Sequence, residues 1–257
     1  MTDGNRLSQV LRRLGVRRGG VLLVHASLSG TGLSPASVRD ALLETLGPDG
    51  TLVVPAFTPE NSDTSRAHRA LTAGMTEREQ EEVRAAMPPF EPAFTPCPAV
   101  GALAECVRTT PSAVRSAHPQ TSFAGLGPRA AELLVGHDPY CHLGERSPLA
   151  RLFDADAQIL LFRVGFESCT AFHLAEYRMT PPPPTRTYRC VVGSRGNWIS
   201  YEDATLDDSD FAAIGALLPR ALLSEAEVAE RVVVLCGMRD TVDAVQVEMS
   251  AYRQRMT

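Results

Sequence analysis

His173 and Glu176 are the two residues whose types and spacing most directly suggest chemistry. They stand three residues apart in a segment that reads as a helix, so their side chains can share one helical face. An imidazole can accept a proton from an attacking nucleophile, and a neighbouring carboxylate can fix its tautomer and stabilise its charged form. The pair therefore predicts a general base and the group that orients it. A packed histidine beside a solvated glutamate is the alternative that spacing alone leaves open.

The residues before this pair predict how it is positioned. Residues 159–164 form an apolar run without alternation, which is typical of a strand covered on both faces. Gly165 ends that run, and Ser168 or Thr170 can cap the helix that carries His173. In open α/β sheets, ligands bind beyond the carboxyl ends of the strands. We therefore expect the histidine to lie beside a ligand site.

The N-terminal part of the chain predicts a βαβ unit. A strand at 21–24 that ends at His25, a helix at 35–46 that Ser34 caps, and a second strand at 51–55 follow one another. Strands joined in this way are parallel. The loop between the first strand and the helix lies where phosphates bind well, although a plain connection fits it equally.

The remaining chain predicts one long polar segment, a hairpin and further helices. Segment 56–98 is irregular, as binding loops often are, and we expect it to be an insertion on the substrate side that contributes Asn61 and Asp63. Ser224 and Glu227 have the spacing of a capping box, which indicates a helix start. The other predicted elements are a hairpin formed by 188–192 and 198–201 and helices at 6–14, 76–87, 99–107, 128–135, 148–153 and 241–252.

Composition places the chain among ordinary globular proteins. Its 257 residues are 44% hydrophobic and 21% charged, enough for a sizeable core, and we expect a single domain over 1–257. The net charge of −5 gives no support for a nucleic-acid partner, which selects basic surfaces. The first residues lack the apolar core of a signal peptide, and no apolar run approaches the length that spans a bilayer. We therefore expect a cytoplasmic protein without a membrane partner.

The six cysteines predict reduced, mostly packed thiols. They lie far apart and form no C-x-x-C pair, so neither a zinc knuckle nor a disulfide framework is indicated. Cys169 is the one inside the candidate site, and a nucleophilic role for it would require a lowered pKa. The histidines show no H-x-x-x-H or H-E-x-x-H spacing, so no metal site is predicted either.

Five motifs, taken in order, resemble the aminoglycoside N(3)-acetyltransferase family. They span most of the chain and are LGV-x-x-GGVLLVH-x-SL at 14–28, GPDGTLVVPAFT at 47–58, RS-x-HP at 115–119, GE-x-SPLARL at 144–152 and T-x-x-HLAEYR at 170–178. The resemblance implies a three-layer α/β/α sandwich around a mixed, largely parallel sheet, with a long polar insertion and a C-terminal hairpin-plus-helix part. It also implies acetyl-CoA as the cosubstrate and a primary amine of an aminoglycoside or related amino compound as the acceptor.

The resemblance also implies roles for individual residues. His173 matches the family's general base, and Thr170 matches a threonine that helps to bind or polarise the thioester carbonyl. Glu176 and Glu145 match acidic positions near the amine. The residues that fall on the family's CoA-binding loops are Ser27, Leu28 and Ser29, followed by Ser116, His118, Ser122 and Phe123.

The chemistry of amide formation agrees with a single base. An ammonium group cannot attack a thioester, so a base must remove a proton, whereas a thiol leaves with little help from an acid. Direct attack assisted by His173 is therefore the expected route. An acetylated Cys169 is the covalent alternative.

Other functions remain open at this point. A biosynthetic N-acetyltransferase would act on a different amine, and a CoA-binding protein without turnover would carry the same motifs. A metal-dependent hydrolase is the alternative from another class, and its ligands would come from His25, His118, His142, His173 and Glu176. The expected partner is a small-molecule amine. The sequence is compatible with a homodimer and does not identify the acceptor.

Overall fold

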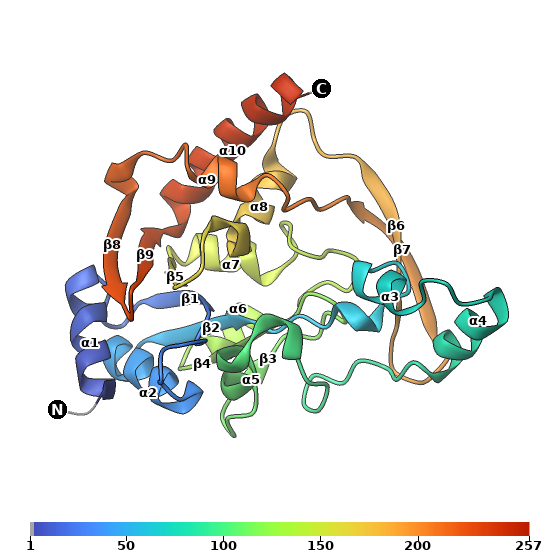
Figure 1. The fold of residues 1–257 in the computed structure, drawn as a ribbon, viewed down its shortest axis with the longest axis horizontal. Coiled ribbons are helices and arrows are strands. Elements are labelled where there is room, and N and C mark those ends of the chain that lie inside the picture. The colour runs from blue at the N-terminus through green and yellow to red at the C-terminus, as the bar shows by residue number, and fades with distance from the viewer. Residues whose placement is uncertain (1–2, 257) are drawn as a thin grey trace.

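The computed structural model describes residues 3–256, and its main feature is a seven-stranded sheet. The strands lie in the order β3–β4–β2–β1–β5–β9–β8 (Figure 1). In chain order they are β1 (Val21–Ala26), β2 (Thr51–Pro55), β3 (Val114–Arg115), β4 (Phe123–Leu126), β5 (Gln158–Phe162), β8 (Leu223–Val228) and β9 (Arg231–Gly237).

The centre of this sheet is parallel and its flanks are antiparallel. β1 pairs in parallel with β2 and with β5, so Leu23 lies opposite Val53 on one side and Ile159 on the other. The pairs β2–β4, β3–β4, β5–β9 and β8–β9 are antiparallel. The predicted βαβ unit and the mixed sheet are confirmed. The parallel part is smaller than expected, because only three strands share it.

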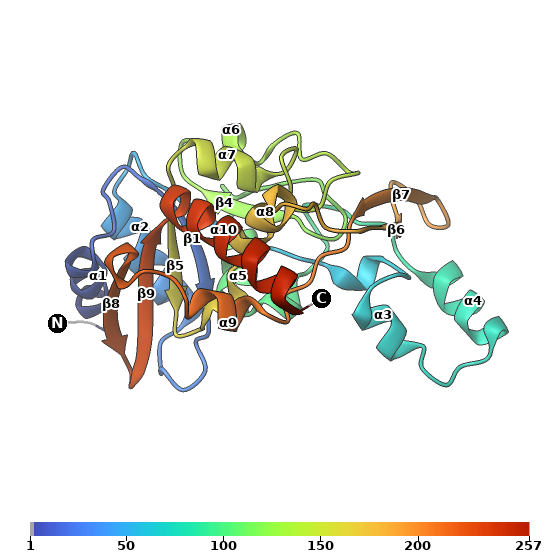
Figure 2. The same cartoon turned by 90° about the horizontal axis from the view of Figure 1, so that it is seen from above.

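Helices cover both faces of the sheet and make the three layers that were expected. The alternation in β5 separates the two faces: Leu160 and Phe162 pack into one apolar cluster, and Ile159 and Leu161 pack into the other. The cluster with Leu160 and Phe162 lies under α1 (Asp3–Leu14), α2 (Pro35–Leu46) and α5 (Ala102–Arg108) (Figure 2). The cluster with Ile159 and Leu161 lies under α6 (Ala130–Leu134), α7 (Pro148–Asp154), α8 (Ala171–Arg178) and α10 (Met238–Met256).

None of the helices within residues 3–256 is apolar over enough of its length to cross a membrane.

A second group of elements extends beyond the end of the sheet (Figures 1 and 2). Asn61 Nδ2 donates to the Val191 carbonyl at 3.0 Å, and Arg189 forms an ion pair with Asp63 at 3.0 Å. These contacts join segment 56–98 to the predicted hairpin, which is confirmed. The elements of this group, which we call the arm, are η1 (Pro59–Asn61), α3 (Arg66–Leu71), α4 (Glu77–Ala86), β6 (Thr185–Val191) and β7 (Trp198–Ala204).

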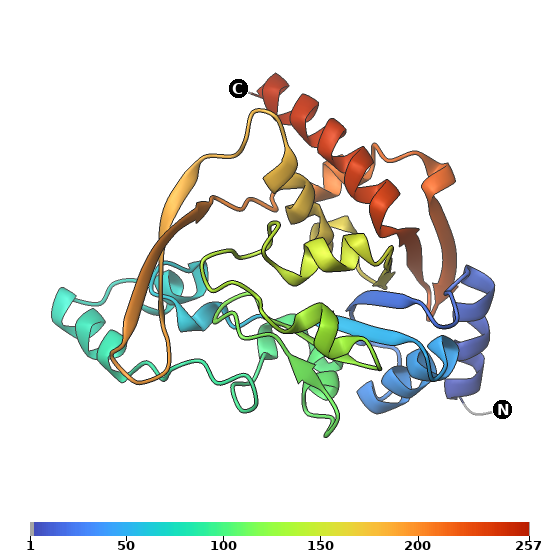
Figure 3. The same cartoon turned by 180° about the vertical axis from the view of Figure 1, so that it is seen from behind.

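The C-terminal part contains the clearest error of the sequence analysis. Ser224 and Glu227 do not start a helix; they lie in β8, whose partner β9 leads directly into α10. The two residues stand three positions apart whether the segment is a helix or a strand, so the capping pattern alone cannot distinguish the two structures. The pairing of β8 with β9 decides for a strand. α10 lies beside α8, as Figure 3 shows from behind. The remaining short elements are η2 (Pro98–Val100), η3 (Phe166–Ser168), α9 (Phe211–Gly215) and η4 (Arg220–Leu222).

Candidate active site

A cleft of about 790 Å³ opens at the carboxyl ends of the three parallel strands. Its walls come from 24–29 at the end of β1 and beyond it, from Val54, Pro55 and Phe57 at the end of β2 and beyond it, and from Val164, Glu167, Ser168 and Thr170 after β5. Pro35, residues 99–104, His173, Asp208 and Phe211 complete the lining. The location agrees with the general preference of α/β proteins for ligand binding beyond strand ends. His173 lies in the lining of this cleft, and its expected role beside a ligand stays a prediction.

His173 and Glu176 form the predicted pair. Nδ1 of His173 lies 2.8 Å from Oε2 of Glu176. The histidine side chain is 12% exposed, whereas that of the glutamate is fully buried. Because Nδ1 faces the carboxylate, Nε2 is the nitrogen that remains for proton transfer in the cleft. The ring also packs on Phe211, with the ring centroids 4.7 Å apart.

The carboxylate of Glu176 is itself held by the far end of the chain. Its other oxygen, Oε1, accepts hydrogen bonds from Arg253 Nη1 at 2.6 Å and from the Asp207 amide at 3.0 Å. Arg253 belongs to α10 and also forms an ion pair with Asp210 at 2.8 Å. Burial opposes the charge of this arginine, but the bonds that it donates to the carboxylates of Asp210 and Glu176 raise its pKa above the usual value. Sequence analysis missed Arg253, since nothing local connects it to position 176.

His25 is a second imidazole in the cleft, at the end of β1. It is 7% exposed, and its Nε2 has no hydrogen-bond partner among the described residues. Burial, together with the nearby charge of His173, lowers the pKa of His25 to about 3. This residue therefore stays neutral at physiological pH. The sequence placed His25 at the end of a strand, and there it was named only as a ligand for the alternative metal-dependent hydrolase.

Thr170 lies at the start of α8 and lines the cleft, and it is 6% exposed. Ser168 belongs to η3, and Thr170 is the residue at the N-cap of α8. The Thr170 side chain makes no capping hydrogen bond, so the expected side-chain cap is absent. The Thr170 hydroxyl is thus not used by the helix end. It remains a donor for a ligand in the cleft.

The residues expected to bind the cofactor separate into two groups. Ser27, Leu28 and Ser29 line the cleft. The other four do not line it and are at most 1% exposed, and their side chains are enclosed by the protein; they are Ser116, His118, Ser122 and Phe123. The cleft therefore gives no support for the second group as cofactor ligands, and that expectation stays a prediction.

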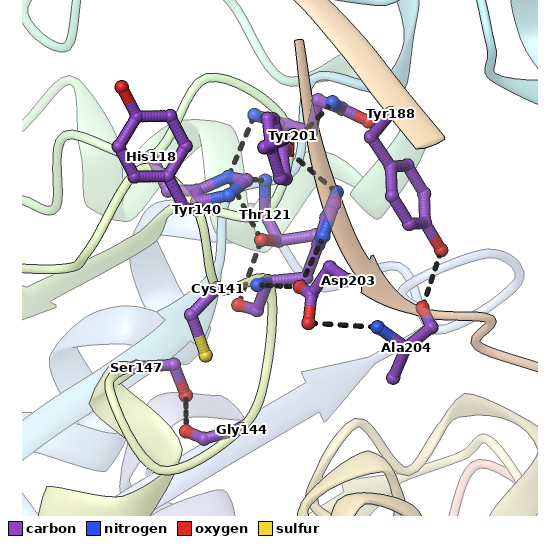
Figure 4. A network of polar contacts seen from close by, with 12 residues as sticks. His118, Thr121, Tyr140, Cys141, Gly144, Ser147, Tyr188, Tyr201, Asp203 and Ala204 are labelled. Atoms are coloured by element: carbon purple, nitrogen blue, oxygen red, sulfur yellow. Dashed lines mark hydrogen bonds and ion pairs between the residues drawn. The ribbon is translucent and has the colours of Figure 1, made fainter. Parts of the chain in front are cut away.

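His118 of the enclosed group belongs to a buried polar network that we call the histidine network, formed by His118, His137, His142, Asp203 and Tyr201. Figure 4 shows His118, Tyr201 and Asp203 of this network. Asp203 Oδ2 accepts from the amide of His142 at 2.7 Å and lies 2.9 Å from its Nδ1. The rings of His118 and His142 are 4.8 Å apart. The network joins β7 of the arm to loops of the main body, so its role is structural.

The three residues expected to bind the acceptor also lie outside the cleft. Glu145 forms an ion pair with Arg178 at 2.6 Å, and Asn61 and Asp63 tie the arm together as described above. Within 56–98, Phe57 is the residue among those described that lines the cleft. Two carboxylates do line it, those of Glu167 and Asp208.

Two chemical alternatives lose support from this geometry. Cys169 is fully buried, and burial raises the pKa of its thiol well above the usual value, so a nucleophilic thiolate is disfavoured. Within residues 3–256, no three His, Cys, Asp or Glu side chains converge in a way that suits a metal ion. Of the proposed hydrolase ligands, His118 and His142 belong to the histidine network, whereas His25 and His173 lie in the cleft.

The comparison with known protein families decides the assignment. The model of the aminoglycoside 3-N-acetyltransferase family matches residues 23–250. The chain belongs to this family. It is an acyltransferase, and the fold and the resemblance predicted from its five motifs are confirmed. A relative from Streptomyces fradiae, aminoglycoside N(3)-acetyltransferase VIII, is 32% identical over 235 residues, which are 88% of this chain and 78% of the relative.

Solved structures of the family share the fold. The YokD protein from Bacillus subtilis superposes with a TM-score of 0.87 at 27% sequence identity and covers 96% of this chain and 98% of its own. A binary complex of AAC-IIIb with CoASH superposes with a TM-score of 0.80 at 25% identity and covers 99% of this chain and 97% of its own. The arrangement around the cleft therefore belongs to a fold that holds CoA in a relative.

Proposed function

We propose that the protein transfers acetyl from acetyl-CoA to a primary amine of an aminoglycoside or related amino compound, by direct attack with His173 as the general base. The observation that carries this proposal is the His173–Glu176 pair, whose Nδ1–Oε2 distance is 2.8 Å and whose imidazole lines the cleft. A buried carboxylate on one ring nitrogen makes the other nitrogen a better proton acceptor.

The cleft suits the acyl donor in size and chemistry. Its volume of about 790 Å³ falls in the usual range for small-molecule sites. Leu28, Phe57 and Val100 supply apolar surface for a pantetheine arm, and the neighbouring loop 27–29 supplies polar groups. The relative that binds CoASH supports this donor.

The residues of this chain have distinct tasks in the transfer. As the amine nitrogen forms its bond to the thioester carbon, Nε2 of His173 takes the amine proton and the carbonyl π electrons move to oxygen. The Thr170 hydroxyl donates to that oxygen, where negative charge develops. Collapse of the tetrahedral carbon breaks the C–S bond, and the proton passes to the departing thiolate. Glu176 holds the imidazole in orientation and compensates its charge throughout.

The acidic residues of the cleft suit a cationic acceptor. Glu167 and Asp208 line the same space as His173. The relatives' names indicate aminoglycoside acceptors. Glu145 and Asp63 are already ion-paired with arginines, which favours a second candidate, an N-acetyltransferase for an amine with fewer positive charges than an aminoglycoside.

The proposal predicts that His173→Gln lowers kcat by about 10²–10⁴-fold and leaves the affinity for CoA nearly unchanged, because the base is needed for attack and not for donor binding. A thiol-release assay with acetyl-CoA measures turnover against a panel of aminoglycosides and non-sugar amines, and mass spectrometry identifies the product. Calorimetry measures CoA binding.

His142→Gln is the matched control, because His142 also pairs with a carboxylate, at 2.9 Å, but lies in the histidine network. We expect this variant to lose stability and to keep its kcat at a temperature where it is folded. Unchanged kcat in His173→Gln would remove His173 from the mechanism. CoA binding without turnover on any amine would identify a silent CoA-binding protein instead.

A further inference from the structure

Arg163 has an energetically unfavourable backbone conformation and a buried side chain. It is the first residue after β5, and its φ is +60°, in the left-handed region that disfavours residues with a Cβ. Its side chain is buried, with the residue 6% exposed. Its Nε has no hydrogen-bond partner among the described residues, and an unsatisfied buried donor is a further cost. The rest of the guanidinium must therefore be held by other contacts.

Those contacts go to backbone carbonyls on two separate loops. Nη1 of Arg163 donates to the carbonyl of Ser29 at 2.6 Å and to that of Ser27 at 3.4 Å. Nη2 donates to the carbonyl of Ala229, in the turn between β8 and β9, at 3.3 Å. One buried cation thus joins the loop after β1 to the β8–β9 turn.

This contact connects two walls of the cleft. Val164, the next residue along the chain, and Thr170 belong to one wall, and loop 27–29 belongs to another. The Ser27 amide also donates to the Phe162 carbonyl at 3.0 Å, so the start of the loop is tied to β5 by the backbone. The bonds from Arg163 add a second tie that reaches Ser29, and together they fix the separation between the donor loop and the segment that leads to His173.

The same bonds also orient a backbone donor. In a trans peptide the carbonyl and the following N–H point in opposite directions. With the Ser27 carbonyl facing Arg163, the Leu28 N–H points away from the guanidinium, and Leu28 lines the cleft. A loop amide held in this way is a fixed donor for an acyl or phosphate oxygen.

We propose that Arg163 is a positioning residue for the acyl donor: it clamps loop 27–29 so that the Leu28 amide is presented to acetyl-CoA at a fixed distance from His173. The inference rests on the proposed function for the identity of the donor. It does not depend on which amine is the acceptor.

Arg163→Gly is the decisive variant, because glycine accepts a left-handed backbone without strain and the chain is expected to fold. We expect the Kd for CoA and the KM for acetyl-CoA to rise about tenfold, the loss of a hydrogen-bonded clamp. The KM for the amine should change less than twofold. Arg163→Lys keeps the charge but carries all its donors on one nitrogen, which cannot span carbonyls on two separate loops, so it should restore only part of the affinity.

Arg151→Ala is the matched control. Arg151 also donates to main-chain carbonyls, those of Leu133 at 3.3 Å and Gly136 at 2.9 Å, but it does not line the cleft. We expect this variant to bind CoA as the wild type does. An Arg163→Gly protein with wild-type affinity for CoA, or an equal loss in both variants, would overturn the inference.

The two proposals can fail separately. Wild-type turnover together with unchanged donor binding in Arg163→Gly removes the role of Arg163 and leaves the acetyltransferase function intact. A wild-type protein that neither binds CoA nor releases thiol removes the proposed function, and the role of Arg163 with it.

Discussion

At the scale of single residues, the site depends on Glu176 more than its sequence position suggests. Its carboxylate is fully buried and serves His173 with one oxygen and Arg253 with the other. A buried charge is tolerated only when it is paired and hydrogen-bonded. The base, its orienter and the arginine therefore act as one unit, and each would be costly to remove alone.

Glu176→Gln should lower kcat by about 10²–10⁴-fold, because an amide cannot accept from both His173 and Arg253 and its NH₂ group faces one of these donors. It should also destabilise the protein by about 3–5 kcal/mol, since Arg253 loses a buried partner. Steady-state kinetics and urea unfolding measure the two effects.

Glu145→Gln is the control for this substitution. It breaks an ion pair whose glutamate side chain is 58% exposed, so we expect a stability change within about 1 kcal/mol and wild-type kcat. Equal effects of the two substitutions would contradict the role assigned to Glu176.

At the scale of elements, the short helix α9 places an aromatic wall against the base. Phe211 at its start contacts the His173 ring, and Gly215 at its end lies against Phe166 of η3. A Cβ at position 215 would lie 2.3 Å from Cγ of Phe166, closer than packed atoms allow. The absence of a side chain at Gly215 is therefore what lets α9 pack closely on η3.

Gly215→Ala should move α9 away from η3 and displace Phe211 from His173. We expect a destabilisation of roughly 1–3 kcal/mol from overpacking and a fall in kcat of about tenfold or more, since small displacements of catalytic groups are costly. Thermal unfolding and steady-state kinetics measure both. Gly4→Ala is the control because a Cβ there meets nothing within 4 Å, and a similar loss of kcat in that variant would refute the argument.

At the scale of the whole molecule, the histidine network joins the arm to the main body. Tyr201 and Asp203 belong to β7 of the arm, and His118 and His142 belong to loops of the body. Burial lowers the pKa of all three network histidines, that of His137 to about 4 and that of His118 well below its ordinary value. The network is therefore built from neutral imidazoles.

This state makes stability dependent on pH. An unfolded histidine has a pKa of about 6.5, so below that pH the unfolded chain binds protons that the folded network excludes. The free energy of unfolding should fall as the pH drops from about 6.5 to about 4, by up to about 1.4 kcal/mol per pH unit for each histidine. Urea unfolding at pH 7.5, 6.0 and 5.0 measures this slope.

His137→Gln tests the source of that slope. The free energy of unfolding of this variant should depend less steeply on pH than that of the wild type. Glutamine takes up no proton on unfolding, whereas His137 does below about pH 6.5. His68→Gln is the control within the arm, because the carboxylate of Asp63 opposes the lowering of the pKa of His68 by burial. Its slope should stay closer to that of the wild type. A free energy of unfolding that is constant between pH 7.5 and pH 5.0 would contradict the neutral network.

The sequence by itself determined the features that depend on neighbours along the chain. The spacing of His173 and Glu176, the helix that Ser34 caps and the strand 51–55 follow from patterns with periods of a few residues, and all of them are present. The order of motifs was likewise enough to identify the family.

Only the tertiary structure decided which distant residues meet. Arg253 contacts Glu176 across 77 positions of the sequence, and Arg163 contacts Ser29 across 134. His142 pairs with Asp203 and does not enter the cleft. Such contacts depend on the order of the strands in the sheet and on how the helices pack over it. Local patterns carry no information about either, so they could not show that Ser116 and His118 are enclosed by the protein whereas Ser27 lines the cleft.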